Sequence, residues 1–115
     1  MAGSSWKKSQ PELVAAFAMC VHAHPELAMR LMFGYQAAFL GGHMTTALHE
    51  DRWIVRLAEA DRAALRELGG SGFEPMPGRP MREYVTLPAS IILDPAALDA
   101  WIARAIANVR ALAPK

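Results

Sequence analysis

The sequence LMFGYQAAFLGGHMTTALHEDRWIVRL, residues 31–57, has the pattern of three antiparallel β-strands joined by two tight turns. Gly41 and Gly42 predict the first turn, because glycine alone adopts positive φ without a steric cost. Glu50 and Asp51 lie where the second turn is required, and aspartate favours turns because its side chain bonds to the nearby backbone. The helical segments on either side carry apolar stripes that need a sheet to cover. We therefore take these strands as the centre of the fold.

The two faces of the predicted sheet differ in polarity. Alternate positions of a strand point to opposite faces, so one face carries Met44, Leu48, Trp53, Val55 and Leu57. The other face is mixed, as expected where helices cover a sheet on one side only. Its apolar residues suggest a homodimer contact at Tyr35, Phe39 and Ile54. Gly34 interrupts the alternation of the first strand and predicts a bulge or a close backbone approach.

A first helix is predicted before these strands. Ser9 and Glu12 have the S-x-x-E spacing of a capping box, in which each side chain bonds to the other residue's backbone N–H. The helix ends at Ala23 or His24, because Pro25 disfavours helical geometry in the residue before it.

Two more helices and a fourth strand follow. Residues 58–68 predict a short helix with Leu65 and Leu68 facing inward, and residues 82–87 are β-branched and aromatic enough for a strand. Asp94, followed by proline, begins the last helix. Its regular apolar stripe consists of Leu98, Trp101, Ile102, Ala105, Ile106, Val109 and Leu112.

These elements predict an α+β protein with two layers, in the order α-β-β-β-α-β-α. The sheet is an antiparallel β-meander of about four or five strands, with helices packed on one face. Residues 1–8 form a polar N-terminal tail in which Trp6 docks on the body, and residues 9–115 form a single domain. The loop at residues 71–80 is rich in glycine and proline, and Phe73 fixes it to the body.

The composition excludes several classes of protein. A net charge of +1 and a pI near 8.0 give no strong basic field, whereas nucleic-acid-binding domains typically have a pI above about 9. Cys20 is the single cysteine, so neither an intrachain disulfide nor a cysteine-built zinc site forms, and a reducing cytoplasm is expected. The apolar run at residues 13–21 is shorter than the ~20 residues that a bilayer requires, so we expect no membrane association.

No catalytic or cofactor-binding motif stands out. Cys20 and His24 are four residues apart on one helix, which is the minimal spacing of a cysteine–histidine nucleophile pair. The alternative is a small buried thiol beside a histidine at a helix end. His43 and His49 share a strand face, but at ~3.4 Å per residue they lie about 20 Å apart, too far to bind one metal ion. We expect no metal and no cofactor.

The arginines are the best candidates for contact with a partner. Arg62 and Arg66 are four residues apart on an exposed helix face, Arg79 and Arg82 bracket the proline-rich loop, and Arg56 projects from the third strand. Such a stripe suits phosphates or an acidic partner. The alternative is a set of solvated faces balanced by Glu59, Asp61, Glu67 and Glu83.

Several motifs occur together in an order that resembles a known family. They are R-x-M-F-G at residues 30–34, W-I-V-R-L at residues 53–57, F-E-P-M-P-G-R-P-M-R-E-Y at residues 73–84, and a final D-P-x-x-L-x-x-W helix. From about residue 9 onward the chain resembles the TfoX/Sxy N-terminal domain family. The resemblance implies a two-layer α+β fold and a link to regulators of natural competence, which assist a cyclic-AMP-responsive activator. Those regulators carry a second, C-terminal helical domain, and the family supplies no established catalytic residues.

The resemblance therefore implies a non-enzymatic bacterial accessory or regulatory module that acts through a protein partner, with direct DNA binding as a second route. Arg79 and Arg82 are the expected contact residues. The alternative is a small enzyme or a small-molecule-binding domain that uses a groove between the sheet and the loop from Gly69 to Pro80. A pocket that combines histidine or Cys20 with a carboxylate favours this alternative, and a flat charged surface favours the interaction module.

Overall fold

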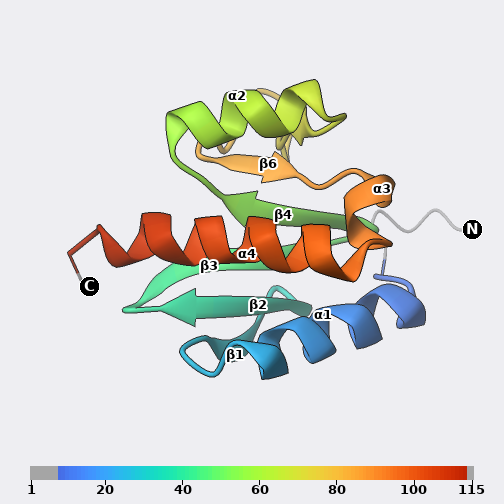
Figure 1. Ribbon diagram of the computed structural model, residues 1–115. Coiled ribbons are helices and arrows are strands. Elements are labelled where there is room, and N and C mark those ends of the chain that lie inside the picture. Colours follow the sequence, from blue (N-terminus) through green and yellow to red (C-terminus); the bar gives the residue numbers. More distant parts are fainter. Residues whose placement is uncertain (1–7, 114–115) are drawn as a thin grey trace, which may run out of the picture.

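The computed structural model describes residues 8–113 and contains an antiparallel sheet with four helices (Figure 1). The sheet has six strands in the order β1-β2-β3-β4-β6-β5. The strands are β1 (Ala28–Met32), β2 (Tyr35–Leu40), β3 (His43–His49), β4 (Arg52–Arg56), β5 (Ser71–Gly72) and β6 (Tyr84–Thr86). The helices are α1 (Pro11–Ala23), α2 (Glu59–Glu67), α3 (Ala89–Ile92) and α4 (Pro95–Arg110). The predicted α+β class is confirmed.

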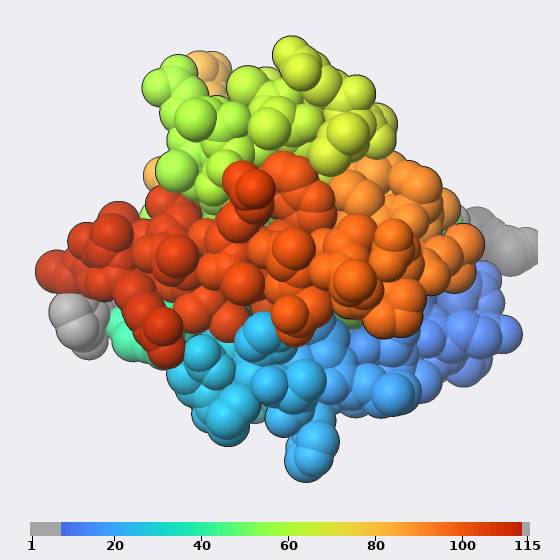
Figure 2. Space-filling view, in the orientation of Figure 1, coloured from blue at the N-terminus to red at the C-terminus, as the bar shows by residue number. Residues whose placement is uncertain are grey.

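The helices cover one face of the sheet, as the sequence predicted. Helix α4 crosses the middle of the sheet, with α1 below it and α2 above it in Figures 1 and 2. All four helices contribute side chains to one buried cluster, in which Phe17 of α1 packs on Trp53 of β4 with ring centroids 5.1 Å apart. The indole N–H of Trp53 donates to Thr46 Oγ1 at 2.8 Å, so the two polar groups are satisfied within this core.

The opposite face of the sheet carries a second core, which the sequence did not predict. Phe73, which directly follows β5, and Tyr84, the first residue of β6, pack with side chains of β2, β3 and β4 on this side. The Tyr84 hydroxyl donates to the Met44 carbonyl at 2.8 Å. The chain's own loop therefore buries the residues that suggested an exposed homodimer contact, namely Tyr35, Phe39 and Ile54.

The first predicted strand is in fact two strands, β1 and β2. Phe33 and Gly34 form a two-residue turn with φ of 54° and 86°, and both central positions of a type I′ hairpin turn require positive φ. The predicted bulge at Gly34 is therefore wrong, and the register shift lies instead between Ala38 and Phe39. Phenylalanine disfavours positive φ, so Gly34 was the one local signal for this turn, and it was interpreted as a bulge. The predicted turn at Gly41 and Gly42 is confirmed.

Most of the helix ends predicted from local sequence signals are confirmed. Helix α1 ends at Ala23, and the Asp94 carboxylate accepts hydrogen bonds from the first turn of α4. The capping box is wrong, since Gln10 precedes the helix without a side-chain cap and Ser9 Oγ donates to the Glu50 carbonyl. Leu68 was predicted to face inward but is 57% exposed, because it follows the last residue of α2.

Two predictions for the remaining segments have different outcomes. Phe73 is buried and fixes its loop to the body, as expected. The predicted contact of Trp6 lies outside the described residues. Within residues 8–113, none of the helices is long and apolar enough to cross a bilayer.

Candidate functional site

A hollow lies on the second face of the sheet, between the β1–β2 turn and the loop after β5. Its volume is about 480 Å³, within the range of small-ligand pockets. Most of its lining is apolar, and four methionines contribute flexible side chains that adapt to irregular partners. The lining residues are Met32, Phe33, Tyr35, Met44, Ala47, Leu48, His49, Glu50, Ile54, Phe73, Pro75, Met76 and Met81. We call this hollow the methionine pocket.

One wall of the methionine pocket is a loop with its own hydrogen bonds. The Met81 N–H donates to the Phe73 carbonyl at 2.9 Å and closes the loop at its base. At the tip, Gly78 has φ of 76°, and its N–H donates to the Glu74 carboxylate at 2.8 Å. The Arg79 N–H donates to the Met76 carbonyl. These bonds hold the wall in one shape, so the pocket is largely preformed.

His49 is the polar group at the inner end of the pocket. Its ring lies between the rings of Tyr35 and Phe73, with centroids 5.2 and 5.3 Å away. Burial lowers the pKa of His49, nearby Arg52 lowers it further, and Glu50 opposes both effects. The imidazole is therefore neutral at neutral pH. Within residues 8–113, its buried Nδ1 has no hydrogen-bond partner, and a buried polar atom without a partner is costly.

The carboxylate of this pocket is partly engaged. The Glu50 carboxylate accepts a hydrogen bond from the Arg52 guanidinium at 3.4 Å, and both side chains are about one-third exposed. Glu50 also raises the pKa of Tyr35, after the larger effect of burial. The pocket thus combines a histidine with a carboxylate, the combination that favours the alternative of a small enzyme or a small-molecule-binding domain. No serine, threonine, cysteine or lysine accompanies them among the lining residues.

Positive charge lies beside the pocket. Arg79 and Arg82 are exposed on the loop that forms its wall, and neither forms an ion pair or side-chain hydrogen bond with any other residue in the described part of the chain. Arg30 of β1 lies over the Phe39 ring with its guanidinium 4.0 Å from the ring centroid. Cations without carboxylate partners on one side of the molecule favour an anionic partner there.

The structure separates the other predicted arginines from this group. Arg56 is bound to Glu83 and its side chain is only 18% exposed, so its charge is already balanced. Arg62 donates to the Leu57 carbonyl at 2.6 Å and stabilises the entry to α2. Arg66 is exposed on α2, which packs in the helical layer. Of the five arginines predicted as contact residues, Arg79 and Arg82 lie on the loop that forms one wall of the methionine pocket.

The predicted cysteine–histidine pair lacks the features of a nucleophile. Burial, aided by the charge of Asp99, raises the pKa of Cys20 to about 11, so the thiol is protonated at neutral pH and is a poor nucleophile. No hydrogen bond joins Cys20 to His24 in the described residues. His24 instead bonds through Nε2 to Asp99 of α4 at 2.8 Å. This contact ties the end of α1 to α4, which is a structural role.

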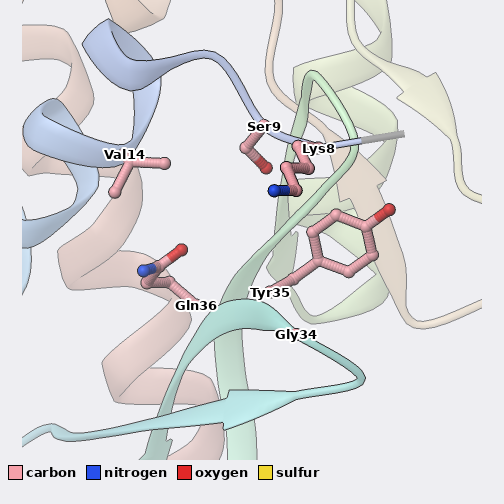
Figure 3. Close-up of a pocket in the computed structure, with 6 residues that line it drawn as sticks. All are labelled: Lys8, Ser9, Val14, Gly34, Tyr35 and Gln36. Carbon is pink, nitrogen blue, oxygen red and sulfur yellow. The ribbon is translucent and has the colours of Figure 1, made fainter. Parts of the chain in front are cut away.

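A second hollow of about 400 Å³ lies between the segment before α1 and the start of β2 (Figure 3). In this view the Lys8 amine lies on one side of the hollow, and Val14 and the Gln36 amide lie on the other. Tyr35 lines this hollow and the methionine pocket alike. In residues 8–113, no group of three or more metal-ligating side chains is present, here or elsewhere.

The sequence indicated part of this site and missed the rest. It placed a groove beside the loop from Gly69 to Pro80 and singled out Arg79 and Arg82. It treated His49 only as a metal candidate, because its position between two rings depends on strand pairing and on the loop that returns over the sheet. Phe33 was part of a motif, but its 83% exposure at the pocket rim was not predicted.

Comparison with protein families gives one match. The family model described as TfoX N-terminal domain matches residues 20–109, which is most of the chain. The matched region includes the whole sheet, the methionine pocket and most of α4. A comparison with curated proteins found no matching relative.

Proposed function

Because the chain belongs to the TfoX N-terminal domain family, we propose that it is a bacterial cytoplasmic accessory module that regulates a protein partner by binding it. Family membership supports a regulatory or accessory role in general. That the chain binds a protein partner, and does so in the cytoplasm, belongs to the proposal. The surface of the chain supports binding to a protein partner.

One observation supports this function best: an apolar pocket lies beside two arginines that have no partner among residues 8–113. Interfaces typically have an apolar core with a polar rim, and arginine is enriched among residues that contribute most to binding. Phe33 and Met76 are 83% and 60% exposed and line the same pocket, and exposed apolar side chains that gather in one place mark interaction sites. A partner with an apolar side chain flanked by acidic residues matches this surface.

The double variant Arg79→Ala/Arg82→Ala tests the proposal. Tagged wild-type protein is used to isolate its partner from cells, and the affinity of the purified partner is then measured for each variant. We expect about a tenfold or greater loss of affinity with the thermal midpoint nearly unchanged, because neither side chain holds the fold.

Arg110→Ala is the matched control, since Arg110 is a surface arginine at the end of α4 that pairs with Glu26. Equal affinity of the double variant and wild type would contradict a role for the two arginines. A large fall in the melting temperature would instead assign them a structural role.

Direct contact with DNA is the less favoured route. Anisotropy of labelled duplex DNA, measured at about 50 and 200 mM salt, distinguishes it, because phosphate contacts produce a steep loss of affinity with salt. We expect no measurable binding even at about 50 mM salt. Tight binding that salt abolishes and Arg79→Ala/Arg82→Ala weakens would replace the protein partner with DNA.

A second candidate function is the binding of a small molecule in the methionine pocket. The unpartnered Nδ1 of His49 favours it, because a hydroxyl or amide of a ligand would satisfy that atom. Thermal-shift measurements with a set of uncharged apolar alcohols and amides test it, since a ligand that binds only the native state raises the melting temperature. The shift should be lost in His49→Phe. Equal shifts in both proteins would place binding elsewhere.

A further inference from the structure

Among residues 8–113, no segment pairs with the outer edge of strand β1. It is the outermost strand, paired with β2 on one side only, and all five of its residues are exposed (Figure 1). Met29 and Leu31 are 41% and 65% exposed, and Phe33 at the adjoining turn is 83% exposed. An exposed apolar edge strand is a ready template for pairing with another chain.

The usual protections of an edge are absent from β1. Soluble proteins blunt an edge with proline, a bulge, a covering segment or outward charges. β1 contains no proline, and its pairing with β2 runs without a register shift. Its single charge, on Arg30, is held against the Phe39 ring on the second face of the sheet. The edge therefore remains able to pair.

The hairpin geometry identifies which backbone groups are free to pair. Met32 and Tyr35 close a two-residue turn, and such a closing pair exchanges hydrogen bonds within the hairpin. Hydrogen-bonded and non-bonded pairs alternate along antiparallel strands, so Arg30 also bonds toward β2. Met29 and Leu31 then direct their N–H and C=O groups outward. These four groups are what an added strand would bond.

A second copy of the chain fits this edge poorly. Antiparallel self-pairing that uses all four outward groups centres on Arg30 and places it directly opposite Arg30 of the other copy. Like charges opposite each other destabilise a strand pair. In the described residues Arg30 forms no ion pair, so the same position favours an acidic residue on the incoming strand.

We propose that β1 binds an extended segment of a protein partner as an added antiparallel strand, with an acidic residue opposite Arg30 between two apolar residues. Main-chain hydrogen bonds would supply affinity and the alternate side chains specificity, as in other cases of strand addition. The inference rests on the proposed function, since the segment belongs to the protein partner.

The position of Phe33 supports the proposal. A bulky residue with φ of 54° that is also exposed is rare, and strained residues cluster at binding sites. Met32, the last residue of β1, and Phe33, in the turn that follows it, also line the methionine pocket. A strand bound along β1 would therefore lead directly to the pocket beside Arg79 and Arg82.

Titration of the full chain with two synthetic peptides tests the proposal. The peptides are Ser-Thr-Val-Glu-Val-Thr-Ser and its counterpart with lysine in place of glutamate. At up to about 1 mM peptide, we expect amide shifts and slowed hydrogen exchange at Met29 and Leu31 in nuclear magnetic resonance spectra, and tighter binding of the glutamate peptide. No change at these amides up to that concentration would overturn strand addition.

Two variants make the test specific. Leu31→Pro removes an outward N–H and no bond to β2, so we expect about a tenfold loss of peptide affinity, whereas Leu31→Ala keeps the N–H and should lose less. Arg30→Glu should reverse the preference toward the lysine peptide, which keeps the proposal falsifiable if the proline variant misfolds. An unchanged preference would overturn the assignment of Arg30.

The outcome is separable from that of the proposed function. Arg110→Ala should leave binding of the short peptides unchanged, because Arg110 lies at the end of α4 and not on β1. The double variant Arg79→Ala/Arg82→Ala is measured separately, against the protein partner. If the peptides bind but the double variant keeps full affinity for the partner, only the role of the two arginines fails. A dimer of the free protein that Leu31→Pro dissociates would assign the edge to a second copy and overturn the proposal.

Discussion

At the scale of single residues, the surroundings of one histidine change its pKa, and the surroundings of one glycine leave no space for a side chain. His49 is a titratable ring enclosed by two aromatic rings, with a lowered pKa. Gly70 lies where α2 meets β6, so closely that a side chain does not fit. Each gives a measurable consequence.

His49 should make stability depend on pH. Its pKa in the folded protein lies below its ordinary value of 6.5, so the unfolded chain binds more protons in that region. Its contribution is complete above pH 6.5 and is lost as the pH falls toward the folded-state pKa. We expect the melting temperature to drop less between about pH 7.5 and 5.5 in His49→Gln than in wild type. His22→Gln, at an exposed position, is the control. Identical pH dependence in His49→Gln and wild type would contradict the role of His49.

Gly70→Ala should destabilise the protein by about 1–3 kcal/mol, as overpacking in a core does. A Cβ at this position would lie 2.9 Å from the Leu65 carbonyl oxygen and 3.0 Å from Val85 Cγ1, both in well-packed surroundings. Gly72→Ala is the matched control, because its Cβ would meet only the end of the flexible Arg66 side chain at 3.5 Å. Urea denaturation measures both. Equal free energies of unfolding for the two variants would show that the backbone at Gly70 moves aside.

At the scale of secondary-structure elements, α4 is the helix with the clearest local signals. Its apolar stripe is buried across the sheet, and Asp94 Oδ1 accepts hydrogen bonds from the N–H groups of Ala96 and Ala97. A carboxylate here also interacts favourably with the helix dipole. β1 has no such internal protection, because its outer edge is open.

Asp94→Ala should lower the free energy of unfolding by about 1 kcal/mol, because the first turn of α4 loses its cap. Asp94→Asn should keep most of that stability, since asparagine caps nearly as well. Chemical denaturation of the two variants beside wild type gives the comparison. Equal losses would mean that the charge, and not the cap, stabilises the helix.

At the scale of the whole molecule, the sheet separates two cores of different construction. Helices cover one face, and a single loop with Phe73 covers the other. The residues that match the TfoX N-terminal domain, 20–109, include the whole sheet and the segments that pack on both of its faces. The proposed binding surface lies on the loop-covered face, so its shape depends on how firmly the loop is held.

Phe73→Ala should cost about 3 kcal/mol, the usual loss for a buried phenylalanine, and should also open the methionine pocket. Met76→Ala in the same loop is the control, because Met76 is 60% exposed and its loss should change stability by less than about 0.5 kcal/mol. Thermal denaturation provides the measurement. A small effect of Phe73→Ala would mean that the second core contributes little to the fold.

The sequence predicted the candidate site only in outline. Arg79 and Arg82 stood out because they bracket a distinctive proline-rich loop, and the groove beside that loop was one of two alternatives. Arg56 was also among the candidate contact residues, although the structure pairs it with Glu83. The difference between a free and a paired arginine depends on a residue 27 positions away, which no local pattern reveals.

The sequence by itself determined the elements whose causes are local: the turn at Gly41 and Gly42, the cap at Asp94 and the stripe of α4. Glycine conformation, capping and helical periodicity act over a few residues, so they can be predicted from the sequence. Only the tertiary structure decided the turn at Phe33, the second core under Phe73 and the pocket around His49. Those features arise because strands pair and a loop folds back across the sheet, and such contacts between distant residues override local preference.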